Sequence, residues 1–379
     1  MTVFISLLVI ILAVLAVVGV HEYGHFIVAR WCGVGVRKFA IGFGPALWSR
    51  RSPKTGIEYT INCLPLGGYV KLFDSREGPL SDSERAVSFD NQAIYKRVLV
   101  IFAGPGMNFV FALLAFWIMS AMGYMAIKPM IKAITPNSLA AEAGLTAPQE
   151  IVAVEGQPAH DWTSVILPMV LRIGDPGNLE ITTQQNNESK DYNIPLANWR
   201  LDPLKPNLLA SLGIEPDLPK TANSPLIYEK RFSLVGSVTE SYRLTKQFLW
   251  LNTVVIGKML VGKISVQSLA GPLSLFQGAL LSFKAGVAAF LGFLGFISIA
   301  IGFVNLLPIP GLDGAQILYL LIEKITRKPV SIPLQILAYR LGMIVLTILF
   351  IQVMMNDIVR YYGSNPKEST RAQHQTSTR

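Results

Sequence analysis

The stretch "TVFISLLVIILAVLAVVGVHEYGH", residues 2–25, ends a long apolar run with three ionisable side chains. Residues 2–20 carry no charge and have the length needed to cross a bilayer as a helix, about 20 residues. A signal peptide would have a basic start, a shorter apolar run and a small-residue cleavage site, all missing here. We therefore expect a retained transmembrane helix.

The rest of the chain also has the composition of a membrane protein. Only 15% of its 379 residues are charged, against about 25% in soluble domains. Three further runs are long enough to span a bilayer: residues 98–124, 285–307 and 334–355. The apolar piece at 247–257 is too short. The sequence thus predicts four transmembrane helices.

Basic residues predict the orientation of these helices, because cytoplasmic loops are enriched in Lys and Arg. They gather between the first and second runs and between the third and fourth: Arg30, Arg37, Lys38, Arg50, Arg51, Lys54, Lys71, Lys96 and Arg97, then Lys324, Arg327 and Lys328. Both termini and residues 125–284 then face outward. Such anchoring accounts for the net charge of +9, and no pattern indicates nucleic acid. Cys32 and Cys63 fall on the reducing side, where we expect no disulfide.

The cytoplasmic segment after the first run has a strand pattern. In "GIEYTINC" (56–63), Ile57, Tyr59, Ile61 and Cys63 alternate with polar residues. After Gly67 and Gly68, residues 69–73 can pair back as a hairpin. With the glycine-rich turn "GFGP" (42–45), this predicts a β hairpin over about 40–73.

The outer segment divides into a domain, a linker and a helix. Residues 126–215 alternate short strands and helices, and are enough for one small core. The prolines and small polar residues of the stretch 216–225 indicate a linker. From Leu234, apolar residues recur at helical spacing, which predicts an amphipathic helix on the membrane surface. The polar tail from 363 is predicted to be disordered.

The histidines of HEYGH have the spacing of metal ligands. His21 and His25 share one helix face, and Glu22 lies about 100° round the helix, where it can act on a bound water. H-E-x-x-H is the zinc-protease pattern of two ligands and a base. The alternative is a structural arrangement near the membrane interface, where ionisable groups are tolerated.

A catalytic zinc needs a third protein ligand. His160 and His374 lie in the outer segment and the tail, far from the required depth. Asp313 follows the third run in "NLLPIPGLDG" (305–314), and that run crosses in the same direction as the first. The prolines of residues 305–314 prevent a regular helix there. Non-helical backbone at membrane depth indicates a protein-lined cavity. The alternative for Asp313 is a helix cap.

These two motifs, in this order, resemble those of the site-2 protease family of intramembrane zinc metalloproteases. Further matches are "FGP" (43–45), "PLGGYVK" (65–71), "AGPGMNF" (103–109) and "AGPLSL" (270–275), and the outer segment resembles a PDZ domain. The resemblance implies a polytopic α-helical membrane protein with four transmembrane helices, a cytoplasmic-side membrane-associated β hairpin and one periplasmic PDZ-like α/β domain. The expected parts are 1–124 with the first two helices and the hairpin, 125–215 as PDZ-like domain, 216–284 as linker and surface helix, 285–362 with the last two helices, and the tail 363–379.

The resemblance also implies roles for individual residues. His21, His25 and Asp313 are expected to bind Zn²⁺, and Glu22 to activate the water. Asn305 is expected to hold the substrate backbone or the oxyanion. The strand with Ile57, Tyr59, Ile61 and Cys63 is expected to take an unwound substrate by strand addition. Pro105 and Asn108 are expected to pack the second helix near the site, with close helix packing through Gly104 and Gly106 as the alternative.

The expected function is hydrolysis of a peptide bond in or near the transmembrane segment of single-span proteins in the bacterial inner membrane. An anti-sigma factor already trimmed by another protease is the first substrate class, and its cut would release a cytoplasmic fragment in envelope-stress signalling. Remnant signal peptides are the second, and the PDZ-like domain would exclude substrates with bulky outer domains. The alternative function is a non-proteolytic membrane scaffold with a structural metal site, against which Glu22 argues. A metal transporter would need more polar residues along the helices.

The chain departs from the family pattern at two places. Related chains usually carry two tandem PDZ domains, and only one fits here, so a second is naturally absent or removed near 216–228. After Asp313 the motif reads "GAQ", where a second Gly and a His are common. We expect no effect of this second departure on metal binding.

Overall fold

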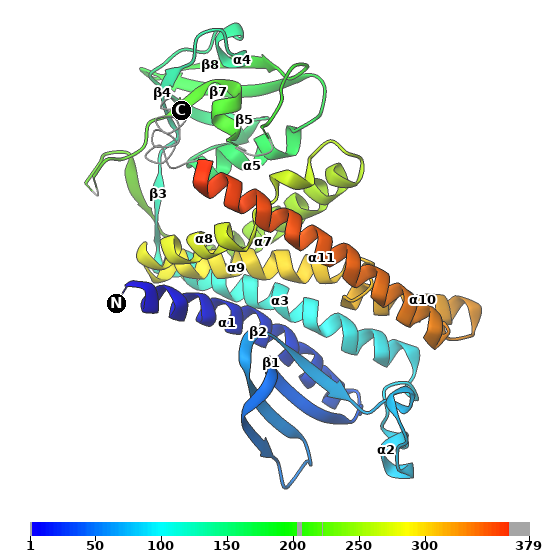
Figure 1. Ribbon diagram of the computed structural model, residues 1–379. Helices are drawn as coiled ribbons and strands as arrows, with labels where there is room; N and C mark the ends of the chain where they lie inside the picture. The colour runs from blue at the N-terminus through cyan, green and yellow to red at the C-terminus, as the bar shows by residue number, and fades with distance from the viewer. Residues whose placement is uncertain (1, 203–206, 222, 364–379) are drawn as a thin grey trace, which may run out of the picture. The chain divides into compact units, whose positions relative to one another are not determined.

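The computed structural model describes residues 2–202, 207–221 and 223–363, so most of the predicted tail lies outside it. The chain folds into two compact units (Figure 1). The first comprises the residues up to 121, 233–249 and 276–348. The second comprises 122–232, 250–275 and the residues from 349 on.

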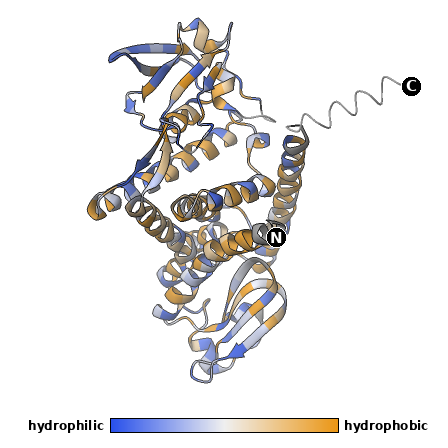
Figure 2. Ribbon diagram, turned by 90° about the vertical axis from the view of Figure 1, so that its left-hand side faces the viewer, coloured by the Kyte–Doolittle hydropathy of each residue, from blue (hydrophilic) through white to orange (hydrophobic). Residues whose placement is uncertain are grey.

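Four helices within the described residues are long and apolar enough to span a membrane, as predicted. They are α1 (Thr2–Trp31), α3 (Ile94–Met122), α9 (Val287–Asn305) and α11 (Ile332–Gly363). Apolar residues predominate along these helices (Figure 2). The apolar run 2–20 lies within α1, and the helix continues past HEYGH to Trp31. His21 and His25 are buried in the protein.

Small residues bring the helices of the first unit close together. A Cβ added at Gly24 of α1 would lie 2.9 Å from the Cβ of Met107 on α3. A Cβ at Gly302 of α9 would lie 3.0 Å from the Cβ of Asn108, which is also on α3. Ser298 of α9 donates a hydrogen bond of 2.9 Å to the carbonyl of Asn108. Helix α3 is thus packed between α1 and α9, by the small-residue packing common in membrane helices.

The predicted hairpin is a sheet of two long, bent strands, β1 (Val36–Arg51) and β2 (Glu58–Leu72). Gly42 and Gly44 have φ of +87° and +83°, which favours glycine, and β1 bends there as expected for "GFGP". Residues 58–61 pair with 38–41 on one side and with 48–51 on the other. The end of β2 pairs with 36–41. The expected pairing of 69–73 with 57–63 is therefore wrong, because the first half of β1 lies between them.

The second unit contains a mixed α/β domain that fits the predicted PDZ-like domain in size and strand pattern. Its strands run in the order β8-β7-β5-β4-β9, and β6 pairs with β5. The strands are β4 (Met130–Ile134), β5 (Gln149–Val154), β6 (Gln157–Pro158), β7 (Asn178–Gln185), β8 (Glu188–Pro195) and β9 (Ile214–Pro216), and the helices are α4 (Leu139–Glu142), α5 (Trp162–Arg172) and α6 (Leu208–Leu212). Fully buried aliphatic side chains such as Ile131, Ile151 and Ile181 form its core.

Several elements were not predicted. Strands β3 (Tyr124–Ile127) and β10 (Ile227–Lys230) pair as a ribbon that leads the chain into and out of this domain. The remaining elements are the 3₁₀ turns η1 (Ser75–Glu77) and η2 (Val266–Ser268), and the helices α2 (Asp82–Ala86), α7 (Leu234–Leu260), α8 (Pro272–Lys284) and α10 (Asp313–Thr326). Among these remaining elements, α7 is the one that the sequence predicted, as the amphipathic helix from Leu234.

Helix α7 exposes the apolar face that the sequence suggested. Leu234, Val238 and Tyr242 are 53–70% exposed, whereas Ser237 and Ser241 are buried. A protein core would have reversed this pattern. An apolar side turned outward is what a helix lying against lipid requires.

Asp161 stabilises the second unit at the start of α5. It accepts a hydrogen bond of 2.8 Å from the Ser164 backbone N–H and lies 3.0 Å from the Lys230 ammonium of β10. Burial raises the pKa of Asp161, but the Ser164 and Lys230 contacts outweigh it and leave the pKa below its ordinary value.

We predict that Asp161→Ala destabilises this region at pH 7 by about 0.5–2 kcal/mol, the usual loss of an N-cap. Because the folded pKa is lowered, the contribution is complete above the unfolded pKa of about 3.9 and is lost as the pH falls through the folded value. Hydrogen exchange of α5 peptides in the full chain at neutral and acidic pH measures this. Glu188→Ala, an exposed change on β8, is the control; equal protection of α5 in both variants would contradict the prediction.

Candidate metal centre and active site

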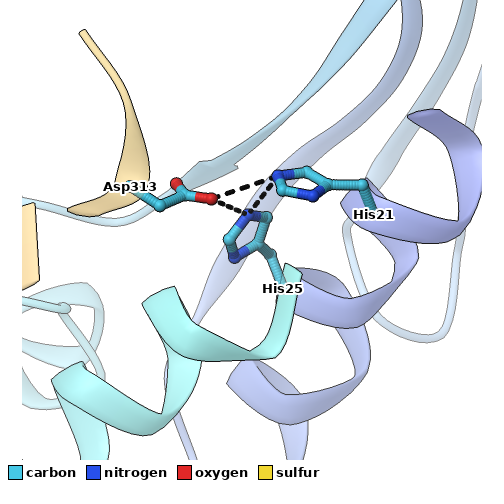
Figure 3. A group of neighbouring side chains, drawn as sticks. All are labelled: His21, His25 and Asp313. Atoms are coloured by element: carbon cyan, nitrogen blue, oxygen red, sulfur yellow. Dashed lines mark hydrogen bonds and ion pairs between the residues drawn. The ribbon is translucent and has the colours of Figure 1, made fainter. Parts of the chain in front are cut away.

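Two histidines of α1 and one aspartate of α10 meet inside the first unit (Figure 3). His21 and His25 lie one helical turn apart and are 7% and 9% exposed. Asp313 is the first residue of α10, after a turn in which Gly311 has φ of +106°. The two imidazoles and the carboxylate point toward one another.

The three potential ligand atoms form a nearly regular triangle. Asp313 Oδ2 lies 3.1 Å from His21 Nε2 and 3.3 Å from His25 Nε2, and the two nitrogens are 3.3 Å apart. Bonds of 2.0–2.1 Å to a tetrahedral zinc would put neighbouring ligand atoms roughly 3.3 Å apart. Asp313 Oδ2 is buried and has no well-formed hydrogen bond among the described residues. The donor set therefore fits a divalent cation.

The ionisation of Asp313 suits a metal ligand. Burial raises its pKa, but the contacts with His21 and His25 outweigh burial and lower the pKa to about 2. The carboxylate is thus charged at neutral pH, as coordination requires.

Helix α3 orients both imidazoles through their Nδ1 atoms, on the side of each ring away from Asp313. His25 Nδ1 donates to the Val100 carbonyl at 2.9 Å, which leaves Nε2 free for a metal. His21 Nδ1 lies 3.2 Å from the side-chain amide of Asn108, which is fully buried. The amide nitrogen Nδ2 is the atom that faces His21, and Oδ1 has no partner among the described residues. Rotation of the amide by 180° exchanges the two atoms, and Oδ1 then accepts the Nδ1 proton of the tautomer that binds a metal.

Gly104 makes room for the two rings. A Cβ at this position would lie 2.6 Å from Cε1 of His25 and 2.9 Å from Cε1 of His21. A Cβ at Gly106, two residues on, would meet only the Phe102 ring of its own helix, at 3.3 Å. The two glycines of "AGPGMNF" therefore differ in what they contact. Pro105 is buried in α3 beside this contact.

A cavity of about 620 Å³ opens in front of the three ligands. Glu22 and Asn305 line it, as does the end of β2 from Gly68 to Leu72. Glu22 stands outside the ligand triangle, and a Cβ at Gly68 would lie 2.8 Å from its Cγ. Asn305 donates to the Ile301 carbonyl at 3.0 Å. The cavity brings together the ligands, a carboxylate, an amide and a strand.

The residues chosen for strand addition lie elsewhere. Ile57, Tyr59, Ile61 and Cys63 do not line the cavity, and residues 58–61 have pairing partners on both sides. The strand that reaches the cavity is 68–72, whose first four residues belong to the motif "PLGGYVK" (65–71). The sequence did not predict that this strand reaches the cavity, because Gly67 and Gly68 interrupt the alternation of apolar and polar residues.

We predict that Gly104→Ala weakens metal binding. Overpacking costs about 1–3 kcal/mol, and because the displaced atoms belong to the ligands this corresponds to roughly a five- to 150-fold loss of affinity. Zinc titration against a competing chelator measures it, with Gly106→Ala as matched control. Equal affinity of the two variants would show that the rings do not need this glycine.

Asn108 gives a second prediction. Asn108→Ala leaves the His21 Nδ1 proton without an acceptor and should reduce metal affinity about 10- to 100-fold, as losses of such supporting hydrogen bonds do. Asn108→Asp should retain the affinity, since a carboxylate oxygen accepts the same proton. If both variants lose the metal alike, Asn108 acts through packing alone.

Comparison with known proteins agrees with this site. The sequence model of peptidase family M50 matches residues 9–349. The chain is 30% identical to the regulator of sigma E protease of Haemophilus influenzae, over 92% of this chain and 98% of the relative. It is 32% identical to the regulator of sigma-E protease RseP of Escherichia coli K12, over 92% and 97%. A Vibrio cholerae protein provisionally named a zinc metalloprotease is 31% identical, over 92% and 97%.

The alignment with the Escherichia coli protein is longer than the part of this chain that it covers. It extends over 439 positions, whereas 92% of this 379-residue chain amounts to about 349 residues. About 90 aligned positions are thus filled only by the relative. That is about the size of the strand domain between β4 and β9.

The family match over most of the chain and the identity along nearly the whole length of these relatives confirm the resemblance drawn from the motifs: the chain belongs to peptidase family M50, the intramembrane metalloproteases of the site-2 type.

Proposed function

We propose that this chain is a zinc-dependent intramembrane protease that cuts single-span membrane proteins in or near their transmembrane segment. The observation that carries the proposal is the His21–His25–Asp313 triangle, which shares one cavity with Glu22. Both histidines lie on α1, a helix apolar enough to span a membrane, which a metal site in a water-soluble domain would not need.

His21 Nε2, His25 Nε2 and Asp313 Oδ2 would hold the metal. Two imidazoles and one carboxylate are typical of catalytic zinc, and three protein ligands leave one position open. When bound, zinc lowers the pKa of water and polarises the scissile carbonyl. The relative named a zinc metalloprotease supports this choice of metal.

Glu22 is the proton carrier in this scheme. Its carboxylate lies in the cavity without being a member of the ligand triangle, so it is free to take a proton from the attacking water and pass it to the leaving amine. One N–H of the Asn305 amide is held by Ile301, and the other is available to the substrate backbone or the oxyanion. A structural metal site, as in the scaffold alternative, would require the ligands but no carboxylate at this place.

The substrate backbone would be held by strand 68–72 in place of 57–63. A transmembrane helix satisfies all its backbone groups internally, so its peptide bond becomes reachable only when it unwinds. Residues 68–71 pair with 38–41 on one side and line the cavity, so an extended peptide can add to their other side. Gly68 has no side chain to obstruct it.

The relatives named regulators of sigma E protease suggest the substrate class. By that analogy the substrate is an anti-sigma factor of the inner membrane, trimmed on its outer side by another protease, with remnant signal peptides as a second class. The cut would release a cytoplasmic fragment. The PDZ-like domain, on the periplasmic side with both termini, would exclude substrates that retain bulky outer domains.

Glu22→Gln tests the proposal. We predict that the variant keeps about one zinc per chain while cleavage of a trimmed single-span substrate falls about 10²- to 10⁴-fold, the usual contribution of a general base. Glu142→Gln, an exposed change on α4, is the matched control. Normal cleavage by Glu22→Gln would contradict the role of Glu22. Zinc binding without cleavage by the wild type would favour the scaffold.

A further inference from the structure

A second cavity, of about 530 Å³, adjoins the catalytic cavity in the first unit. The two share Asp74, Arg76, Phe89, Gly311, Leu312 and Gln316 in their walls. From there the second cavity extends along α10, past Tyr319 to Glu323, and along the first half of α11 to Arg340. Its size is that of a pocket for a small ligand or a short peptide segment.

The charges that line this cavity do not balance. Arg76 pairs with Asp74. Arg97 lies 2.7 Å from Glu323 and over the ring of Phe89. Arg340 makes no ion pair or hydrogen bond with any residue that the structure describes, and its side chain is exposed. The cavity wall therefore carries one uncompensated positive charge.

A second polar group in the wall is also unsatisfied. Arg97 is only 5% exposed, and its Nε is buried without a hydrogen-bond partner among the described residues. Buried donors are nearly always paired in folded proteins, so this N–H indicates an acceptor that binds there. Carboxylates and phosphates are the acceptors that match a guanidinium best, and a carboxylate is the one that a peptide side chain supplies.

We infer that the second cavity binds the flank of the substrate on the cytoplasmic side of the cleaved bond, and that Arg340 selects flanks with an acidic side chain. The inference rests on the proposed function. A peptide added to strand 68–72 enters the shared wall of the two cavities, and its next residues reach the segment between α10 and α11. Most single-span proteins carry Lys or Arg on this flank, and an unpaired cation disfavours them. Arg340 would thus protect ordinary membrane proteins from cleavage.

The rival explanation of Arg340 is an anchor to lipid. An arginine near a helix end can extend its guanidinium to phosphate head groups. That role makes no distinction between substrates, whereas a selective role changes with the charge of the flank. Substrate pairs that differ in one charge separate the two explanations.

The test uses the full chain with zinc and two single-span substrates that are identical except for Asp or Lys at one position of the cytoplasmic flank. We expect the wild type to prefer the Asp substrate in kcat/KM by about two- to fivefold, the range of an exposed ion pair. Arg340→Gln should bring the ratio close to one, and Arg340→Glu should invert it. Lys324→Gln, an exposed change on α10 outside both cavities, should keep the wild-type ratio.

Binding separates this inference from the proposed function. The same two substrates are titrated against Glu22→Gln protein, with and without Arg340→Gln, and the ratio of the two Kd values is measured. If the wild type cuts neither substrate, the proposed function fails, and the binding ratio still decides the role of Arg340. A ratio of one in protein that retains Arg340 would overturn the inference, as would an unchanged ratio in Arg340→Gln. Inversion by Arg340→Glu would also show that this variant is folded.

Discussion

Two imidazole nitrogens and one carboxylate oxygen lie 3.1–3.3 Å apart in the buried centre of the first unit, and the rest of that unit depends on this contact. In the neutral tautomers that bind a metal, with the ring protons on Nδ1, all three atoms offer lone pairs, so their closeness is unfavourable unless a cation lies among them. Burial of ionisable groups among apolar helices adds a further cost. Binding of a divalent metal offsets both, and it links α1 to α10 across nearly 300 residues of sequence.

Helix α3 makes the contact possible without contributing a ligand. The Val100 carbonyl holds one imidazole, the Asn108 side chain holds the other, and Gly104 leaves the space that both occupy. Ser298 and Gly302 of α9 then fix the other side of α3. Exact placement of the ligands therefore comes from hydrogen bonds and close packing in a helix that supplies no ligand itself.

Much of this site could be predicted from the sequence because its signals are local. The spacing of His21 and His25 needs only a helix, and the four spans need only length and polarity. The strand order could not be predicted, since it depends on the bend of β1 at Gly42 and Gly44 and on pairing between distant segments. The hydrogen bond of Asn108 is equally non-local, because a lone asparagine in an apolar helix does not indicate its partner.

X-ray absorption at the zinc edge, measured on the purified full chain, observes the ligands of the metal itself. If His21, His25 and Asp313 hold the zinc, we expect about one zinc per chain and a first shell of nitrogen and oxygen only, with about four ligands at 2.0–2.1 Å and imidazole scattering from two rings. A shell that contains sulfur, a six-coordinate ion, or protein that binds no zinc would contradict the account of His21, His25 and Asp313 as the metal centre.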